Sequence, residues 1–276
     1  MQRNINRHGR YIFKEAVELT YIRRERSAAN RKVKPHILNE ALQLLKDEQW
    51  SPRQISGHLR RKNIRISHER IYQSIRSDGI GELRRHCRHK MKYRRHKTRR
   101  KKHAGKNMIP GRVSIHERPQ EADGSRFGDW EMDLIVGKGQ KSSVLTMVER
   151  STNMFLQKKL SSKQPSHVAR TAWMLLLPYK DHVLTITTDN GSEFMEHEWL
   201  ADRIGATVYF ADPYSPGQKG AVENANKLFR QYYPKGTDFR NVEQADMDEV
   251  QRKINRRPRE KLNFDSPKNV FFKAIS

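Results

Sequence analysis

Positive charge is concentrated at one end of this chain, and this unevenness limits what the chain can fold into. Residues 1–118 carry 33 Lys and Arg against 10 Asp and Glu, whereas residues 119–276 carry 23 against 21. With 276 residues, the chain is long enough for one large or two small domains, each with its own core. The charge distribution therefore predicts a nucleic-acid-binding front region tethered to a nearly neutral globular domain.

Residues 84–106 are the most basic stretch, with 13 Lys and Arg and no acid. Such a block cannot collapse on itself, so we expect it to be extended when free and to neutralise phosphates along a nucleic-acid backbone. A solvated linker with no binding role is the alternative. We assign residues 81–118 as a basic linker. Its candidate DNA contacts are Arg94, Arg95, Lys97, Arg99, Arg100, Lys101 and Lys102.

Ahead of the linker, residues 1–33 form a basic N-terminal remnant and residues 34–80 a small helical domain. Apolar spacing predicts a helix over 35–48, and Ser51-Pro52 and Ser67 are typical N-caps of two short helices. Three helices that end in two short capped ones are typical of a helix-turn-helix, whose last helix enters the DNA major groove. Its candidate base contacts are His68, Glu69, Arg70 and Gln73.

Cys87 is the only cysteine, so no internal disulfide can form, and a reducing cytosol fits. A zinc site is disfavoured because structural zinc usually takes several cysteines at short spacings. The sequence has neither a signal-peptide core nor 18 consecutive apolar residues, so we expect a soluble protein that is not exported.

The rear domain, residues 119–276, alternates strand and helix signals. Strand-like runs at 130–136, 143–149 and 153–160 are consistent with an antiparallel meander. Helices near 165–178 and 193–203 then alternate with strands at 183–188 and 206–210, before a long helix over 217–232. This order predicts an α/β fold of the α+β type, with a mixed sheet flanked by helices.

Three acids occupy positions where packing alone gives no reason for them. Asp133 lies inside a strand, Asp189 closes another at an Asn-Gly turn, and Glu223 lies on the long helix. Carboxylates that converge from different elements typically hold Mg²⁺, which prefers oxygen ligands and reaction phosphates. The sequence therefore predicts two-metal phosphoryl transfer on nucleic acid. Glu131, on the same strand face as Asp133, is either an auxiliary ligand or a rim carboxylate.

Basic residues accompany Glu223 on the long helix. Arg230 lies two turns further on the same face and could clamp a DNA phosphate. Lys227, at i+4, is either a DNA contact or a simple ion-pair partner of Glu223. Lys219, at the entrance of the helix, is expected to meet the substrate.

Several longer stretches resemble the DDE transposases of bacterial insertion sequences, specifically the insertion-sequence-thirty family. They include Gly128-Asp-Trp-Glu-Met-Asp-Leu-Ile135, Thr188-Asp-Asn-Gly-Ser-Glu-Phe194 and Glu223-Asn-Ala-Asn226. The gap of 33 residues between Asp189 and Glu223 is also a trait of that family. The resemblance covers nearly the whole chain.

The resemblance implies a ribonuclease H-like catalytic domain in which Asp133, Asp189 and Glu223 form the metal triad and Arg230 is the associated basic residue. It implies a Mg²⁺-dependent enzyme, with Mn²⁺ as a substitute, that cuts insertion-sequence ends and joins their 3′-hydroxyls to target DNA. The expected partners are the double-stranded terminal inverted repeats, target DNA and further copies of the chain as a homo-oligomer. The expected location is the bacterial cytoplasm, associated with the nucleoid.

The chain departs from the family pattern in two places. A further N-terminal helix-turn-helix is expected and is not evident in the sequence, and Gly217 stands where a tryptophan is expected. The missing front segment favours one alternative function, a truncated DNA-binding regulator of transposition. A separate alternative is a metal-dependent nuclease without joining activity.

Overall fold

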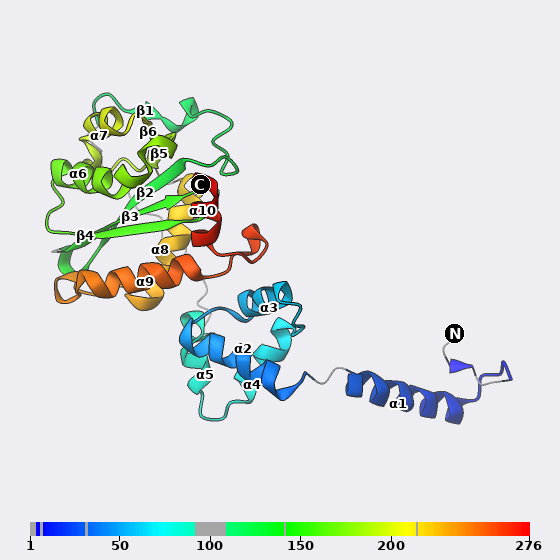
Figure 1. Ribbon diagram of the computed structural model, residues 1–276. Coiled ribbons are helices and arrows are strands. Elements are labelled where there is room, and N and C mark those ends of the chain that lie inside the picture. The colour runs from blue at the N-terminus through cyan, green and yellow to red at the C-terminus, as the bar shows by residue number, and fades with distance from the viewer. Residues whose placement is uncertain (1–3, 6–7, 31–32, 92–108, 141, 214) are drawn as a thin grey trace.

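The chain folds into a small helical unit and a larger sheet unit, with one further helix at the N-terminal end (Figure 1). The computed structural model describes all residues except 1–3, 6–7, 31–32, 92–108, 141 and 214. The N-terminal helix α1 (Phe13–Asn30) stands away from both units in Figure 1. Its Phe13 and Tyr21 side chains are exposed.

The helical unit, residues 35–91, contains the three helices predicted from the sequence. Its elements are α2 (Pro35–Asp47), α3 (Pro52–Arg61), α4 (His68–Ser77), α5 (Glu82–Arg85) and the 3-10 helix η2 (Arg88–Met91). Ser51 accepts a hydrogen bond from Gln54 N and Ser67 one from Arg70 N, so both predicted caps are confirmed. Ile55 and Ile71 are fully buried in the core of this unit, and Cys87 is buried in the same core.

The sheet unit is built on six strands in the order β1-β6-β5-β2-β3-β4. The strands are β1 (Val113–Ser114), β2 (Asp129–Val136), β3 (Ser143–Glu149), β4 (Phe155–Leu160), β5 (Thr185–Thr188) and β6 (Thr207–Phe210). The predicted antiparallel meander is confirmed as β2-β3-β4, and β5 and β6 continue the sheet in parallel with β2. The sheet begins at Val113, ahead of the predicted domain start at 119, because β1 pairs with β6.

Helices cover both faces of this sheet, which gives three layers (Figure 1). They are α6 (Pro165–Leu176), α7 (His197–Ile204), α8 (Gly220–Tyr232), α9 (Gln244–Arg256) and α10 (Pro267–Ile275). Trp130 and Met132 of β2 face one core with α6 and α7, whereas Ile135 faces a second core with α8 and α9. A mixed sheet with this strand order and these flanking helices confirms the α/β, ribonuclease H-like fold expected from the sequence.

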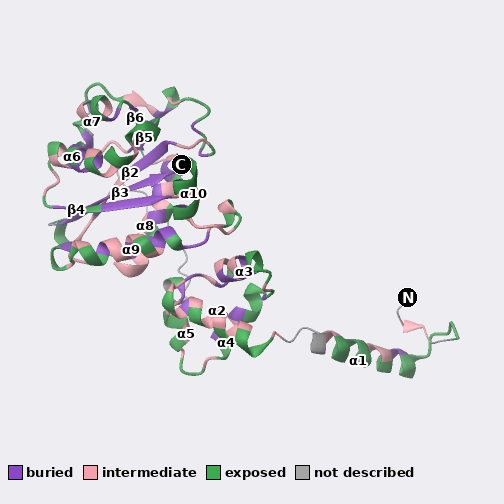
Figure 2. Cartoon of the chain, viewed as in Figure 1, coloured by how far each residue is buried: buried purple, intermediate pink, exposed green. Residues whose placement is uncertain are grey.

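Burial follows this layering, as Figure 2 shows: the strands are mostly buried, apart from the half-buried β1, and the helices are exposed on their outer faces. Contacts also connect the two units. Arg53 pairs with Glu260 at 2.5 Å and Arg61 with Asp265 at 3.0 Å. Gly57 of α3 lies so close to the Phe264 ring that an added Cβ would overlap the ring. Among the described helices, none is both long and apolar enough to cross a membrane.

Candidate active site

Asp133 and Asp189 are brought together by two neighbouring parallel strands. Glu131 of β2 pairs with Thr187 of β5, so two residues further along, Asp133 lies beside Asp189 at the end of β5. The Asp189 carboxylate accepts a hydrogen bond from Gly191 N at 3.0 Å, which fixes the turn that follows the strand. The parallel register of β2 and β5 thus brings two of the three predicted carboxylates together, one from a strand and one from the residue that directly follows a strand.

The ammonium of Lys219 bridges these two carboxylates. Lys219 Nζ lies 3.1 Å from Asp133 Oδ1 and 3.3 Å from Asp189 Oδ2, and the residue is only 7% exposed. Burial by itself would lower the pKa of Lys219, but the two aspartates outweigh it and the pKa is raised. Lys219 therefore remains charged at neutral pH, and its single positive charge offsets half of the negative charge of the two aspartates.

Asp133 is held from a second side by Asn226 of α8. Asn226 Nδ2 donates to Asp133 Oδ2 at 2.7 Å, while its Oδ1 is buried with no hydrogen-bond partner. Burial raises the pKa of Asp133, and the charge and hydrogen bond of Lys219 oppose that rise. Neither contact was predicted from the sequence; Asn226 lies on α8, whereas Lys219 is the residue just before that helix.

Glu223 lies on α8 one turn beyond Lys219 and is half-buried. Within the described ranges, however, no group of three or more Asp, Glu, His or Cys side chains is close enough to hold one ion. The structure therefore brings Asp133 and Asp189 together around Lys219 and does not place Glu223 with them. The triad as a metal site stays a prediction.

The paired aspartates and Asn226 provide donor atoms that suit a hard divalent cation. One cationic group already contacts both carboxylates, so the two side chains are positioned to share a positive ion. The unpartnered Oδ1 of Asn226 is a further oxygen of the type that Mg²⁺ accepts. These residues fit such an ion once Lys219 withdraws.

Glu131 fixes the start of α8 to the sheet. Its carboxylate accepts hydrogen bonds from Val222 N at 2.8 Å and Arg150 Nε at 3.0 Å, and the residue is 1% exposed. Glu131 is therefore not a rim carboxylate. Because it is already paired, it serves to position the helix that carries Glu223 and Asn226.

A second contact fixes the approach to α8. Gln218 Nε2 donates to Asp212 Oδ2 at 2.8 Å, and Asp212 N donates to Gln218 Oε1 at 2.7 Å. His116 Nε2 also lies 2.8 Å from Asp212 Oδ2. The hydrogen bond from Gln218, followed by that from His116, lowers the pKa of Asp212. These bonds set the position of Lys219, the next residue after Gln218.

Arg230 and Lys227 differ in their surroundings. Arg230 Nη2 donates to Val136 O at 3.0 Å and Nη1 to Pro234 O at 3.3 Å, so its guanidinium joins α8 to the end of β2. Burial lowers the pKa of Arg230. Lys227 is exposed, and within the described part of the chain no ion pair joins it to Glu223.

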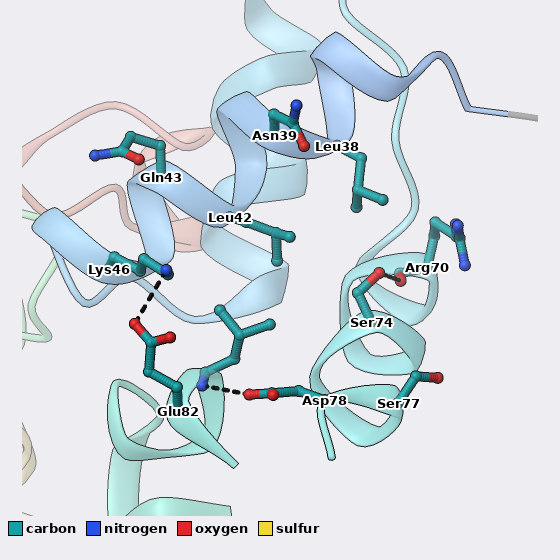
Figure 3. A pocket seen from close by; sticks show the side chains of 11 residues that line it. Leu38, Asn39, Leu42, Gln43, Lys46, Arg70, Ser74, Ser77, Asp78 and Glu82 are labelled. Atoms are coloured by element: carbon teal, nitrogen blue, oxygen red, sulfur yellow. Dashed lines mark hydrogen bonds and ion pairs between the residues drawn. The ribbon is translucent and has the colours of Figure 1, made fainter. Parts of the chain in front are cut away.

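The four candidate base contacts on α4 are all exposed. Glu69 pairs with Arg76 at 2.9 Å, so it is held within its own helix. Arg70 lines an open groove between α2, α4 and α5, opposite Leu38 and Leu42 (Figure 3). The candidate contacts Arg94, Arg95, Lys97, Arg99, Arg100, Lys101 and Lys102 lie outside the described residues.

Residues 125–216 match the family model described as the integrase core domain. The catalytic core domain of BIV integrase is a structural neighbour with a TM-score of 0.43 and 21% identity, covering 54% of this chain and 95% of that one. The strand order and the matched family model define an integrase core of the ribonuclease H-like class.

Proteins related in sequence identify the family within this class. The chain is 38% identical to the transposase of insertion sequence element IS4351 from Bacteroides fragilis, over 98% of this chain and 83% of that protein. It is 36% identical to transposase InsI of element IS30A from Escherichia coli, over 88% of this chain and 68% of that protein. The chain belongs to the IS30 family of insertion-sequence transposases, as the resemblance predicted.

Proposed function

We propose that this chain cuts the ends of an insertion sequence and joins the freed 3′-hydroxyls to target DNA. The pair of aspartates on neighbouring strands, which share one cation at 3.1 and 3.3 Å, is the observation that carries the proposal. Two aspartates that share a cation can hold positive charge beside a phosphate. Phosphoryl transfer needs such charge beside the reacting phosphate.

Asp133, Asp189 and Glu223, with Asn226 beside them, are the residues we propose to hold Mg²⁺ or Mn²⁺. When bound, the ions activate the attacking oxygen and stabilise the leaving one. The chain contributes the geometry: β2 and β5 fix the two aspartates, and Glu131 fixes the start of the helix that carries Glu223. For Glu223 to join the aspartates, Lys219 has to leave their carboxylates.

The helical unit and the basic linker are proposed to hold double-stranded DNA, namely the terminal inverted repeats and the target. The exposed side chains of His68, Arg70 and Gln73 on α4 support base reading by that helix. The charge of residues 84–106 supports backbone contacts. We further propose that the active form is a homo-oligomer assembled on DNA in the bacterial cytoplasm.

A strand-transfer assay on supercoiled plasmid tests this proposal. Oligonucleotides that carry the element's ends are incubated with Mg²⁺ and either the wild-type chain or Asp189→Asn. Joined products from the wild type alone support the transposase. Cleavage without joining indicates a nuclease, and DNA binding without either reaction indicates a regulator of transposition.

A further inference from the structure

Three arginines gather where the helical unit meets the sheet unit: Arg88 of η2, and Arg257 and Arg259 just after α9. We call them the arginine cluster. Arg257 is 2% exposed, Arg259 is partly exposed and Arg88 is exposed. The cluster therefore reaches from the interior of the protein to its surface.

The hydrogen bonds of the two inner arginines are incomplete. Arg257 donates from Nη1 to Gln231 Oε1 at 3.3 Å and from Nη2 to Tyr232 Oη at 3.1 Å. Arg259 donates from Nη2 to Ile254 O at 3.2 Å. The Nε atoms of both are buried without a partner. All of these partners are neutral, so none offsets the charge of a guanidinium.

The three guanidiniums also lack acidic partners. Every Asp and Glu of the sequence falls within the described residues, and none of their carboxylates forms an ion pair within 4.0 Å of a guanidinium nitrogen of the arginine cluster. Burial lowers the pKa of Arg257, and the charge of Glu48 opposes this effect only in part, because the Glu48 carboxylate pairs with Arg256 at 3.4 Å. One nearby carboxylate against three guanidiniums leaves a local surplus of positive charge.

The positive charges of the arginine cluster lie close enough to shift the pKa values of its two inner members. Burial, then Arg257 and Arg88, lower the pKa of Arg259 to about 9. Arg259 is still charged at neutral pH, but its charged form is destabilised. Native proteins seldom leave buried charge uncompensated, because an unpaired ion away from water costs several kcal/mol.

We propose that the arginine cluster is a binding site for a phosphate-class oxyanion. Guanidinium forks match the several oxygens of a tetrahedral phosphate and can share them between side chains. The anion would supply the negative charge that the protein itself does not provide. The source is either free inorganic phosphate or a phosphodiester of DNA, and the second source rests on the function proposed above.

Thermal unfolding in phosphate, compared with chloride at matched ionic strength, tests the site without metal, DNA or catalysis. We expect phosphate to raise the Tm of the wild type by about 3 °C when its concentration is ten times Kd. Arg88→Gln and Arg259→Gln, which change the more accessible members, should each remove most of that rise. Arg252→Gln is the matched control, because Arg252 is an exposed arginine paired with Glu249 at 2.8 Å.

An equal Tm in phosphate and chloride, or a full phosphate effect in both cluster variants, would overturn the proposal. Repeating the measurement with saturating duplex DNA identifies the source. If a DNA phosphate occupies the site, the extra stabilisation by phosphate disappears, and the cluster variants bind duplex several-fold more weakly. If the stabilisation persists, the site takes free phosphate. Neither readout depends on strand transfer, so failure of the transposase assay would leave this result standing.

Discussion

The three triad carboxylates can each be replaced by an amide of the same shape. We expect Asp133→Asn, Asp189→Asn and Glu223→Gln to reduce cleavage and joining by at least about 100-fold, because each removes one charge that would hold the ions. DNA binding, measured by gel shift without divalent metal, should stay within about twofold of wild type. Loss of binding in all three variants would mean that these acids serve the fold.

Lys219 gives a second prediction for single residues. Lys219→Met leaves Asp133 and Asp189 facing each other without a cation, so we expect metal-free protein to lose about 1–2 kcal/mol of unfolding free energy. The expected loss is modest because the Asp189 side chain is 47% exposed. Urea denaturation measures the loss, with Lys227→Met, which changes an exposed lysine of α8, as the control. Adding Asp189→Asn should recover part of it, and a double variant no more stable than Lys219→Met would contradict the pairing.

The aspartate pair could be predicted from the sequence, whereas its surroundings could not. Strand patterns place Asp133 and Asp189 in the sheet, and the sheet register then brings them together. Lys219 was expected to meet the substrate, which stays a prediction, but its contacts with both acids, 86 residues away from Asp133 along the chain, were not foreseen. Side-chain pairing between distant elements depends on how α8 packs on the sheet. This packing cannot be deduced from a local sequence pattern.

At the scale of elements, α4 is expected to read DNA sequence. Replacing His68, Arg70 and Gln73 by Ala should weaken binding to the element's own ends by about 1–3 kcal/mol for each base that is no longer recognised. Binding to unrelated duplex should change little. Competition binding measures the ratio of the affinity for the element's own ends to the affinity for unrelated duplex. Lys62→Ala, in the turn before α4, is the control. An equal weakening on both DNAs would assign these side chains to the phosphate backbone.

Most elements of the fold agree with the sequence patterns to within a few residues, including the two helices begun by Ser51 and Ser67. Helix α9 was not predicted, because Met247, Val250 and Ile254 give only a sparse apolar stripe in a charged segment. Strand β1 has two residues, so it is too short for an alternating pattern of apolar and polar residues to be detected. The assignment of α2 to α4 as a helix-turn-helix stays a prediction of function.

At the scale of the whole molecule, Gly57 and Phe264 control how the two units meet. Replacing a helical glycine by alanine ordinarily stabilises a helix by about 1 kcal/mol. Here the new Cβ would overlap the Phe264 ring, so we expect Gly57→Ala to separate the units and increase the radius of gyration. Small-angle X-ray scattering measures this change. The double variant with Phe264→Ala should restore the compact form, and an unchanged radius in Gly57→Ala would show that this contact does not hold the units together.

The distance between Asp133 and Asp189 is set by the main chain. Neighbouring strands lie about 4.8 Å apart whatever side chains they carry. Asp133 lies on β2, and Asp189 directly follows β5, where a continuation of the β2-β5 register would place it beside Asp133. The hydrogen bonds between β2 and β5 thus fix the spacing of the main chain that carries the two charges. The loops and helices around the sheet can therefore change in sequence while the main-chain spacing beneath the two aspartates stays the same.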